Sequence, residues 1–214
     1  MPNVFLIGRP GCGKSIVYKL LAEQLRARGY KGELMRIDDF PILKRIFELD
    51  VEQKRHRRFP KGGMKITDDR VWDDLSMALN EQALKLQSPG RLLFIEFSRD
   101  SYVRAFSHFS PEIMRDSVIL YIDAPFDLCL ERNARRAREE KGLDAHLVSR
   151  EEMEETYLHD DHEELQKHVE APVLVMKNYS DDIKSLKSEL QKIVDKFNES
   201  VDSALKNKLQ EIEA

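Results

Sequence analysis

The sequence GRPGCGKS at residues 8–15 directly follows a short apolar run, VFLI, at residues 4–7. It completes the spacing G-x-x-x-x-G-K-[ST], whose fixed positions are Gly8, Gly13, Lys14 and Ser15. Glycines let backbone N–H groups turn inward around an anion without a Cβ in the way, and a helix that starts there points its positive end at the same anion. The feature therefore predicts a strand, a glycine-rich loop and a helix that together hold a polyphosphate.

The same loop predicts ATP and Mg²⁺ as cofactors. We expect Lys14 to neutralise the β and γ phosphates and the hydroxyl of Ser15 to bind Mg²⁺, which bridges those phosphates. The alternative is a tight glycine turn that happens to precede a helix. The residues expected to contact the nucleotide are Gly8, Arg9, Pro10, Gly11, Cys12, Gly13, Lys14, Ser15 and Ile16.

The rest of the chain alternates apolar runs with helical patterns. After the first strand at 4–8, strands are expected at 33–38, 91–97, 117–125 and 172–177, and a helix is expected from about residue 70 to residue 86. Strands that alternate with helices imply a parallel sheet covered on both faces. The sequence therefore predicts an α/β fold, and its 214 residues with 41% hydrophobic content are compatible with one domain around a sizeable core.

Charge and hydropathy narrow the class of protein further. The 35 Lys and Arg against 39 Asp and Glu give a net charge of −4, which brings no overall bias toward nucleic acid or acidic membranes. No apolar run approaches the about 18 residues of a membrane-spanning helix, and the N-terminus has no basic signal region. We expect a soluble cytoplasmic protein with no membrane partner. Cys12 and Cys129 have neither zinc-ligand nor redox-motif spacing, so free thiols are expected.

Two further motifs give the chain a family resemblance. With MRIDDF at 35–40 and LYIDAPFDLCLERNARRAR at 120–138, it resembles the P-loop kinase group, which includes nucleoside and nucleotide kinases such as adenylate and uridine kinases, and gluconate and shikimate kinases. The resemblance implies a P-loop NTPase fold whose five parallel strands have the order 2-3-1-4-5, with the nucleotide at their carboxyl edge. It also implies an acceptor flap at 39–69 and an arginine-bearing lid at 132–149 within a kinase-like domain of residues 1–197, followed by a C-terminal helical extension, 198–214.

Three acidic residues lie where the resemblance implies catalysis. Asp38 and Asp39 follow the second strand, where the family has a carboxylate that accepts the proton of the attacking hydroxyl or orients the acceptor, and Asp38 is the preferred base. A solvated turn or a helix cap is the alternative. Glu96 lies inside an apolar strand, and we expect it to contact Mg²⁺ or the acceptor, because an uncompensated buried carboxylate is costly. A structural ion pair, with Arg99 as the partner, is the alternative for Glu96.

Arginine residues supply the candidates for charge stabilisation during transfer. Arg132 and Arg136 are four residues apart and therefore share one helix face, from which two guanidinium groups can reach a phosphoryl group together. Their alternative role is a solvated basic face paired with neighbouring glutamates.

The stretch QKRHRRFPKGGMK, 53–65, holds six Lys and Arg and no acid. Its place in the flap suggests an anionic acceptor, and Arg55, Arg58 and Arg99 are the candidates for acceptor binding beside Asp38 and Asp39. Nucleic acid is a wider possibility, and a solvated loop is the plain alternative.

Two segments near the C-terminus have no assigned chemistry. Residues 150–164 are strongly acidic, and their apolar spacing suggests one helix with a buried edge, with His159 and His162 on a solvated face rather than as metal ligands. The apolar stripe that runs from Leu186 to Ile212 suits either a helix packed on its own domain or a homodimer contact.

The sequence as a whole predicts a phosphotransferase. We expect Mg·ATP to donate its γ-phosphoryl group to a small molecule, with a nucleoside, a nucleotide or a related anionic metabolite as first choice. The catalytic set is Lys14, Asp38, Glu96, Arg132 and Arg136, and the metal set is Ser15 and Glu96. A nucleic-acid end kinase and a non-catalytic ATP-binding switch are the alternatives.

Overall fold

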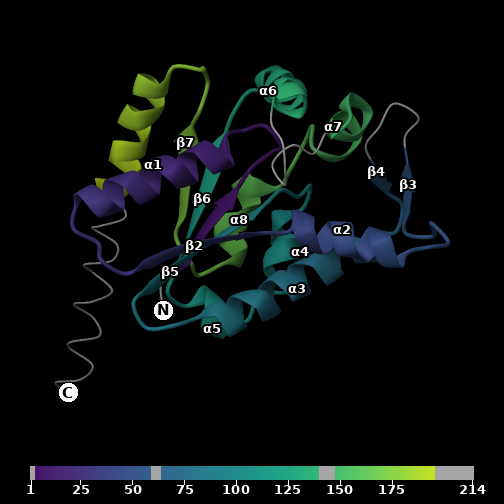
Figure 1. Ribbon diagram of the computed structural model, residues 1–214, viewed down its shortest axis with the longest axis horizontal. Coiled ribbons are helices and arrows are strands. Elements are labelled where there is room, and N and C mark those ends of the chain that lie inside the picture. The colour runs from purple at the N-terminus through teal and green to yellow at the C-terminus, as the bar shows by residue number, and fades with distance from the viewer. Residues whose placement is uncertain (1–2, 59–63, 140–147, 196–214) are drawn as a thin grey trace.

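The computed structural model describes residues 3–58, 64–139 and 148–195. Its centre is a five-stranded parallel sheet of order β2-β5-β1-β6-β7 (Figure 1). Counted along the chain within this sheet, the order is 2-3-1-4-5. The predicted α/β fold, its sheet order and its five main strands are therefore confirmed. The strands are β1 (Asn3–Ile7), β2 (Glu33–Asp38), β5 (Arg91–Phe97), β6 (Ser117–Asp123) and β7 (Val173–Lys177).

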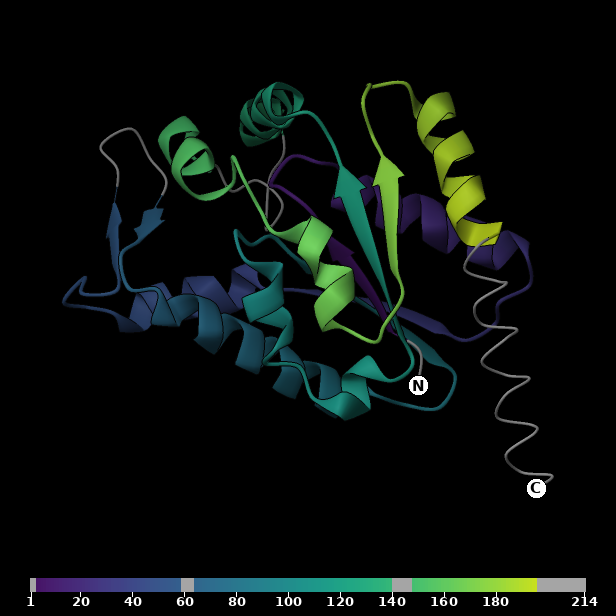
Figure 2. The same cartoon turned by 180° about the vertical axis from the view of Figure 1, so that it is seen from behind.

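Successive side chains of a strand point to opposite faces of the sheet, so these apolar strands present an apolar surface on both faces, and helices cover both. Val4 and Leu6 of β1 belong to one core, and Phe5 and Ile7 to the other. The first core is closed by α1 (Lys14–Ala27), α6 (Phe126–Glu139), α7 (Arg150–Thr156) and the helical residues 183–195. The second is closed by α3 (Arg70–Leu86), α4 (Tyr102–Phe106), α5 (Pro111–Met114) and α8 (His162–His168) (Figures 1 and 2).

The predicted flap is more regular than its composition suggests. It contains α2 (Phe40–Leu49) and an antiparallel hairpin of β3 (His56–Arg58) and β4 (Met64–Ile66). Pro41 does not interrupt the segment, because it lies in the first turn of α2, where its missing N–H leaves no hydrogen bond unmade. The hairpin projects beyond the ends of α2 and α3 in both views and meets α7 through ion pairs, Lys65–Glu155 and Arg57–Glu151 (Figures 1 and 2).

The acidic segment 150–164 was expected to be one helix, and this prediction is wrong. The chain breaks between α7 and α8 because Asp160 and Asp161 turn inward. Asp161 caps α4, accepting hydrogen bonds from Tyr102 N at 2.5 Å and from Ser101 Oγ at 2.7 Å. The Asp160 side chain is 1% exposed and accepts from Tyr121 Oη at 2.8 Å and His162 Nδ1 at 2.5 Å. Burial opposes ionisation, but these hydrogen bonds hold the pKa of Asp160 below its ordinary value. The predicted solvated face is confirmed for His159, which is exposed, but is wrong for His162, whose ring stacks on Tyr121.

The helical residues 183–195 pack along the domain itself, beside α1 (Figures 1 and 2). Leu186, Leu190 and Ile193 are buried in the first core, and Arg28 pairs with Asp195 at 3.1 Å. The predicted extension at 198–214, with its homodimer contact, and residues 140–147 of the predicted lid lie outside the described residues. No helix in the described part of the chain combines the length and the apolar composition needed to cross a membrane.

Candidate active site

The loop between β1 and α1 has the backbone that its glycines permit. Gly11 and Gly13 have φ of 82° and 103°, a region that other residues rarely adopt. A Cβ on Gly13 would lie 2.5 Å from Asn178 Nδ2, and one on Gly11 would collide with the backbone oxygen of Cys129. Both glycines therefore let the loop lie close to α6 and to the segment after β7.

The N-terminus of α1 is built to receive an anion. Gly13 is the N-cap residue, so no side chain caps the first N–H groups, and the first turn of α1 contains no acidic residue. Uncapped N–H groups and the helix dipole both favour a negative ligand. The predicted polyphosphate therefore fits this loop.

Lys14 lies at the centre of the site. Its ammonium donates to Gly8 O at 2.9 Å, Arg9 O at 3.1 Å and Ser98 Oγ at 2.8 Å, and its side chain is largely buried. Ser98 Oγ in turn donates to Gly8 O at 2.7 Å. The lysine is thus held over the loop by oxygen atoms that a phosphate oxygen can replace. Sequence reasoning missed Ser98, although a hydroxyl residue directly after a strand of this sheet is a signal for such a contact.

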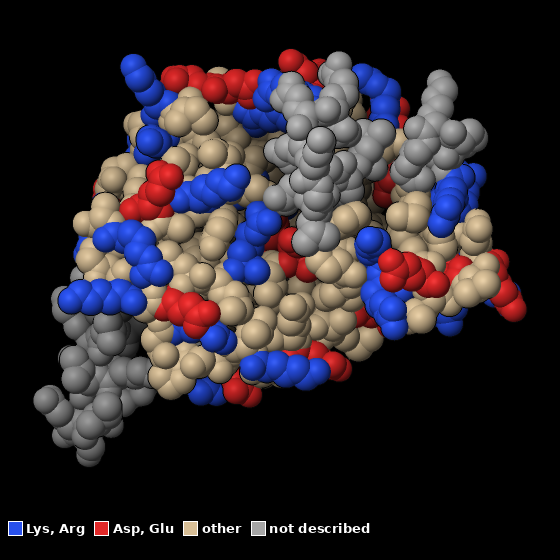
Figure 3. Space-filling model, in the orientation of Figure 1, with Lys and Arg blue, Asp and Glu red and all other residues tan. Residues whose placement is uncertain are grey.

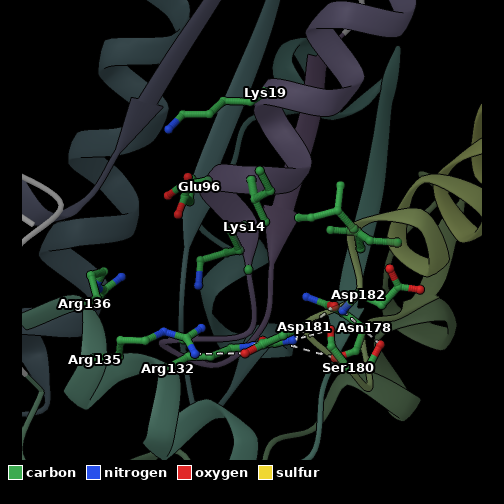
Figure 4. A pocket seen from close by; sticks show the side chains of 16 residues that line it. Lys14, Lys19, Glu96, Arg132, Arg135, Arg136, Asn178, Ser180, Asp181 and Asp182 are labelled. Atoms are coloured by element: carbon green, nitrogen blue, oxygen red, sulfur yellow. Dashed lines mark hydrogen bonds and ion pairs between the residues drawn. The ribbon is translucent and has the colours of Figure 1, made fainter. Parts of the chain in front are cut away.

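A cavity of about 340 Å³ opens beside the loop (Figure 4). Figure 4 shows Lys14 between Glu96 and Arg136 on one side and residues 178–182 on the other. We call it the donor cavity. Its lining residues are Gly11, Gly13, Lys14, Ser15, Ile16, Lys19, Glu96, Arg132, Arg135, Arg136, Asn178, Ser180, Asp181, Asp182, Ile183 and Leu186.

Arg132 joins α6 to the segment after β7. Its guanidinium donates to Asp181 at 2.8 Å and to Ser180 O at 2.6 Å, and Arg135 reaches the same Asp181 carboxylate at 2.9 Å. Hydrogen bonds from Arg135 and Arg132 lower the pKa of Asp181. Asn178 donates to Cys12 O at 2.7 Å, which ties the same segment to the loop. Polar contacts from α6 and from the glycine-rich loop therefore hold residues 178–181, which form one wall of the donor cavity.

A second cavity, of about 290 Å³, lies on the other side of Lys14, and we call it the acceptor cavity. Its lining comes from the glycine-rich loop, the carboxyl ends of β2 and β5, and α2, with single residues from β4, α3 and α7. Lys14, Ser15, Glu96 and Arg136 line both cavities. The other lining residues are Pro10, Asp38, Asp39, Phe40, Leu43, Phe47, Met64, Trp72, Phe97, Ser98, Val148, Glu152 and Tyr157.

Asp38 and Glu96 lie side by side on β2 and β5, where they are register partners. Arg36 Nη1 lies 3.4 Å from Glu96, and its Nη2 lies 4.0 Å from Asp38. Asp38 also accepts a hydrogen bond from Phe40 N at 3.0 Å, at the start of α2. The structure thus brings the two predicted carboxylates together, but the partner of Glu96 is Arg36 rather than the predicted Arg99.

Arg99 is 2% exposed and pairs with Asp39. It also donates to Ser98 O at 2.7 Å, and its guanidinium lies 5.1 Å from the centre of the Trp72 ring. Arg99 does not line either cavity. Its position suits a residue that orients Asp39 in the acceptor wall.

The described basic residues of 53–65 do not converge on the acceptor cavity. Arg55 pairs with Asp74 at 2.6 Å and with Asp68 at 3.4 Å, outside both cavities. Arg58 is exposed on β3 and lines neither cavity. On the face seen in Figure 3, basic and acidic side chains are interspersed over the coloured surface. The predicted acceptor-binding role of Arg55 and Arg58 therefore gains no support from their positions.

Sequence reasoning missed two other residues of the site. Trp72 and Glu152 belong to the acceptor wall, and both came from segments without a motif. Arg9, which was expected to contact the nucleotide, donates to Tyr157 O at 2.7 Å and joins the loop to the end of α7. Cys12 and Cys129 are free and buried, and burial raises the pKa of both thiols.

Comparison with known proteins identifies the family to which the chain belongs. The family model described as AAA domain matches residues 4–158. No curated protein matches the chain. Solved structures similar to the chain include Kti12 of Chaetomium thermophilum in complex with ADP-AlF3, with a TM-score of 0.55 and 16% identity over 91% of this chain and 98% of that one. A gluconokinase from Sinorhizobium meliloti 1021 has a TM-score of 0.52 and 15% identity over 93% of this chain and 97% of its own.

The shikimate kinase of Acinetobacter baumannii in complex with shikimate has a TM-score of 0.50 and 16% identity, covering 94% of each chain. At these identities the likeness shows the fold alone, and it confirms the P-loop fold that the motifs predicted. The family match spans well over half of the sequence. The chain belongs to the AAA domain family and has the fold of the P-loop kinase group.

Proposed function

We propose that the protein is a phosphotransferase that moves the γ-phosphoryl group of Mg·ATP to a hydroxyl group of a small molecule. The observation that carries the proposal is the meeting of the two cavities. Lys14, Ser15, Glu96 and Arg136 line both, so a triphosphate in one cavity and an alcohol in the other would share the same charged groups. Two adjoining cavities suit transfer between two bound molecules, because the second molecule excludes water from the phosphoryl group.

The donor side would be held by the loop. Its N–H groups and Lys14 would bind the phosphates, and Arg132 and Arg136 would stabilise charge on the transferred group. Ser15 and Glu96 would hold Mg²⁺, which neutralises phosphate charge when bound.

The acceptor side would use Asp38 as general base. The acceptor oxygen forms a bond to the γ-phosphorus, its proton passes to the Asp38 carboxylate, and the bond from the γ-phosphorus to the bridging oxygen breaks to leave ADP. Arg36, whose Nη2 lies 4.0 Å from Asp38, would help to hold this carboxylate in place beside Glu96.

A nucleoside, a nucleotide or a related anionic metabolite in the cytoplasm is the class of acceptor that the sequence favours. The described basic side chains of the flap pair with acids instead of lining the acceptor cavity, and this weighs against an anionic acceptor. It also weighs against a nucleic-acid end, which would need cations along a phosphate backbone.

Nucleotide binding and transfer are tested separately. Calorimetric titration with ATP and with its non-hydrolysable analogue AMPPNP, with and without Mg²⁺, should give Mg-dependent binding that Lys14→Ala weakens by at least about tenfold, as expected on losing a charge-assisted contact. Lys44→Ala, which removes an exposed ion pair with Glu48 on α2, is the matched control. Binding that is independent of both Mg²⁺ and Lys14 refutes the donor assignment.

Transfer is followed by ADP formation with a panel of nucleosides, nucleotides and sugars. An acceptor-dependent signal that Asp38→Asn lowers by about 10²-fold or more supports the kinase, since general-base catalysis contributes that much. Tight Mg·ATP binding without any transferred phosphate favours the ATP-binding switch. Activity on oligonucleotide ends that falls steeply with salt favours the nucleic-acid end kinase.

A further inference from the structure

The carboxyl groups of the acceptor cavity differ in their partners. Four carboxyl side chains line it, from Asp38, Asp39, Glu96 and Glu152. Its lining cations, Lys14 and Arg136, also line the donor cavity and therefore lie where the two cavities meet. Arg36 lies 3.4 Å from Glu96 and 4.0 Å from Asp38, and Arg99 pairs with Asp39. Glu152 is therefore the one of the four for which the described residues show no ion pair.

The nearest basic residues of the flap form their ion pairs with other acids. Lys65 on β4 pairs with Glu155, and Arg57 on β3 lies 3.8 Å from Glu151. Both acids belong to α7, the helix that also carries Glu152. The charge of Lys65 favours the ionised form of Glu152, but burial outweighs it and raises the pKa of that carboxyl group.

Glu152 is the most unusual group of the wall. It is 8% exposed, and its carboxyl group has no hydrogen-bond or ion-pair partner among the described residues, although its backbone N–H is held by Ser149 Oγ at 3.1 Å. A buried ionised carboxyl group without a partner is costly. A donor group of a molecule bound in this cavity would supply the partner.

Aromatic side chains also line this cavity. Phe40, Phe47, Trp72 and Tyr157 line it, and the Trp72 and Tyr157 rings meet edge to face with centroids 6.5 Å apart. Aromatic faces bind the C–H faces of sugar and cyclitol rings and attract ammonium groups. Aromatic walls with an unpartnered carboxyl group match a ring that carries an amine.

We propose that the acceptor is an amine-bearing polyol, such as an amino sugar or an aminocyclitol, whose ammonium group binds Glu152 and whose reactive hydroxyl group faces Asp38. The inference rests on the proposed phosphotransfer for the role of the hydroxyl, but the binding of the amine is independent of turnover. It makes Glu152 the residue that sets acceptor specificity.

The test uses matched sets of probes that share one ring and differ in charge. The sets are glucosamine, glucose and glucuronate, and 2-deoxystreptamine, myo-inositol and myo-inositol 1-phosphate. Each probe is titrated calorimetrically into the full chain saturated with Mg·AMPPNP. In at least one set the amine should bind at least about tenfold more tightly than its neutral relative, as expected for a charge-assisted contact, and the anion should bind most weakly.

Two variants assign the preference to its residue. Glu152→Gln should reduce the advantage of the amine to about threefold or less, because a neutral amide can still accept a hydrogen bond but loses the charge. Glu154→Gln changes an exposed glutamate on the same helix that pairs with Arg150 and not with the hairpin, and it should leave the preference as it is in the wild type. AMPPNP affinity should be equal in all three proteins, since neither glutamate lines the donor cavity.

Each outcome decides the inference. A neutral or anionic probe that binds as tightly as the amine overturns it, as does the absence of amine binding in both sets while AMPPNP still binds. An amine preference that survives Glu152→Gln overturns the role of Glu152. Two results count against the proposed function and not against the amine site. The first is a wild-type protein that does not bind AMPPNP. The second is a protein that binds the amines but transfers phosphate neither to them nor to any other acceptor.

Discussion

Replacing Glu152 by glutamine should stabilise the protein at alkaline pH and change it little at acid pH. Burial raises the pKa of Glu152 from 4.5 to about 7. Between these two values the folded chain keeps a proton that the unfolded chain has lost, so stability falls as the pH rises through this window. Glutamine has nearly the same shape and no proton to lose, and it removes this dependence.

The magnitude follows from the size of the shift. One pKa unit corresponds to about 1.4 kcal/mol, so burying the charged form costs about 3 kcal/mol at pH 8, where both states are ionised. At pH 5 the folded group is still protonated and the unfolded group is only partly ionised, which leaves a cost of about 1 kcal/mol. Glu152→Gln should therefore gain about 2 kcal/mol more at pH 8 than at pH 5.

Urea unfolding of the wild type and the variant at both pH values measures this difference through the transition midpoint. Glu151→Gln is the control, because that carboxyl group is 56% exposed and pairs with Arg57, so it should show no such pH dependence. A Glu152→Gln variant that is equally stabilised, or equally destabilised, at the two pH values would refute the reasoning. Such a result would mean that the charged carboxylate is satisfied in the folded state.

Three further substitutions test the site and the core. Gly13→Ala should lower the free energy of unfolding by about 1–3 kcal/mol, because φ is 103° and the new Cβ would collide with Asn178. It should also weaken AMPPNP binding; urea unfolding measures the first effect and calorimetry the second. Arg99→Leu should destabilise by about 3–5 kcal/mol, since it leaves the Asp39 carboxylate without its partner, and a loss under 1 kcal/mol would argue against a structural pair. Phe5→Ala should cost about 3–5 kcal/mol in thermal or urea unfolding, because the ring is fully buried among other aromatic rings, and m should be unchanged.

The main elements were predictable because their signals are local. A short apolar run bounded by turn residues predicts a buried strand, whichever strand it pairs with in the sheet. The glycine spacing predicts the loop. The helix expected at about 70–86 is observed as Arg70–Leu86. The order of the strands came from the family resemblance rather than from any local signal.

The charge partners were not predictable in this way, because they depend on register. Arg36 and Asp38 are two residues apart on β2 and therefore project from the same face of the sheet. Asp38 faces Glu96 in the register of β2 and β5, which brings Arg36 within 3.4 Å of Glu96. An arginine two residues before Asp38 was the available signal. Without the register, Arg99 is the expected ion-pair partner of Glu96, because it lies only three residues away along the chain.

Glu152 shows a different limit of the sequence. It is one of many acids between residues 150 and 164, and nothing in the residue types separates it from Glu151 or Glu154. The packing of α7 against the acceptor cavity buries Glu152 and leaves Glu151 and Glu154 exposed. Only the tertiary structure therefore distinguishes the carboxyl group of α7 that faces the acceptor cavity.

The two cavities divide the charge of the site between them. Five Lys and Arg side chains and three carboxyl groups line the donor cavity, whereas two such cations, four carboxyl groups and several aromatic rings line the acceptor cavity. This difference would favour a triphosphate in the donor cavity and the proposed amine-bearing acceptor in the other. This separation favours a productive pair over two nucleotides bound at once. The shared wall of Lys14, Ser15, Glu96 and Arg136 is then the place where a negative phosphoryl group can pass between them, since its cations face both sides.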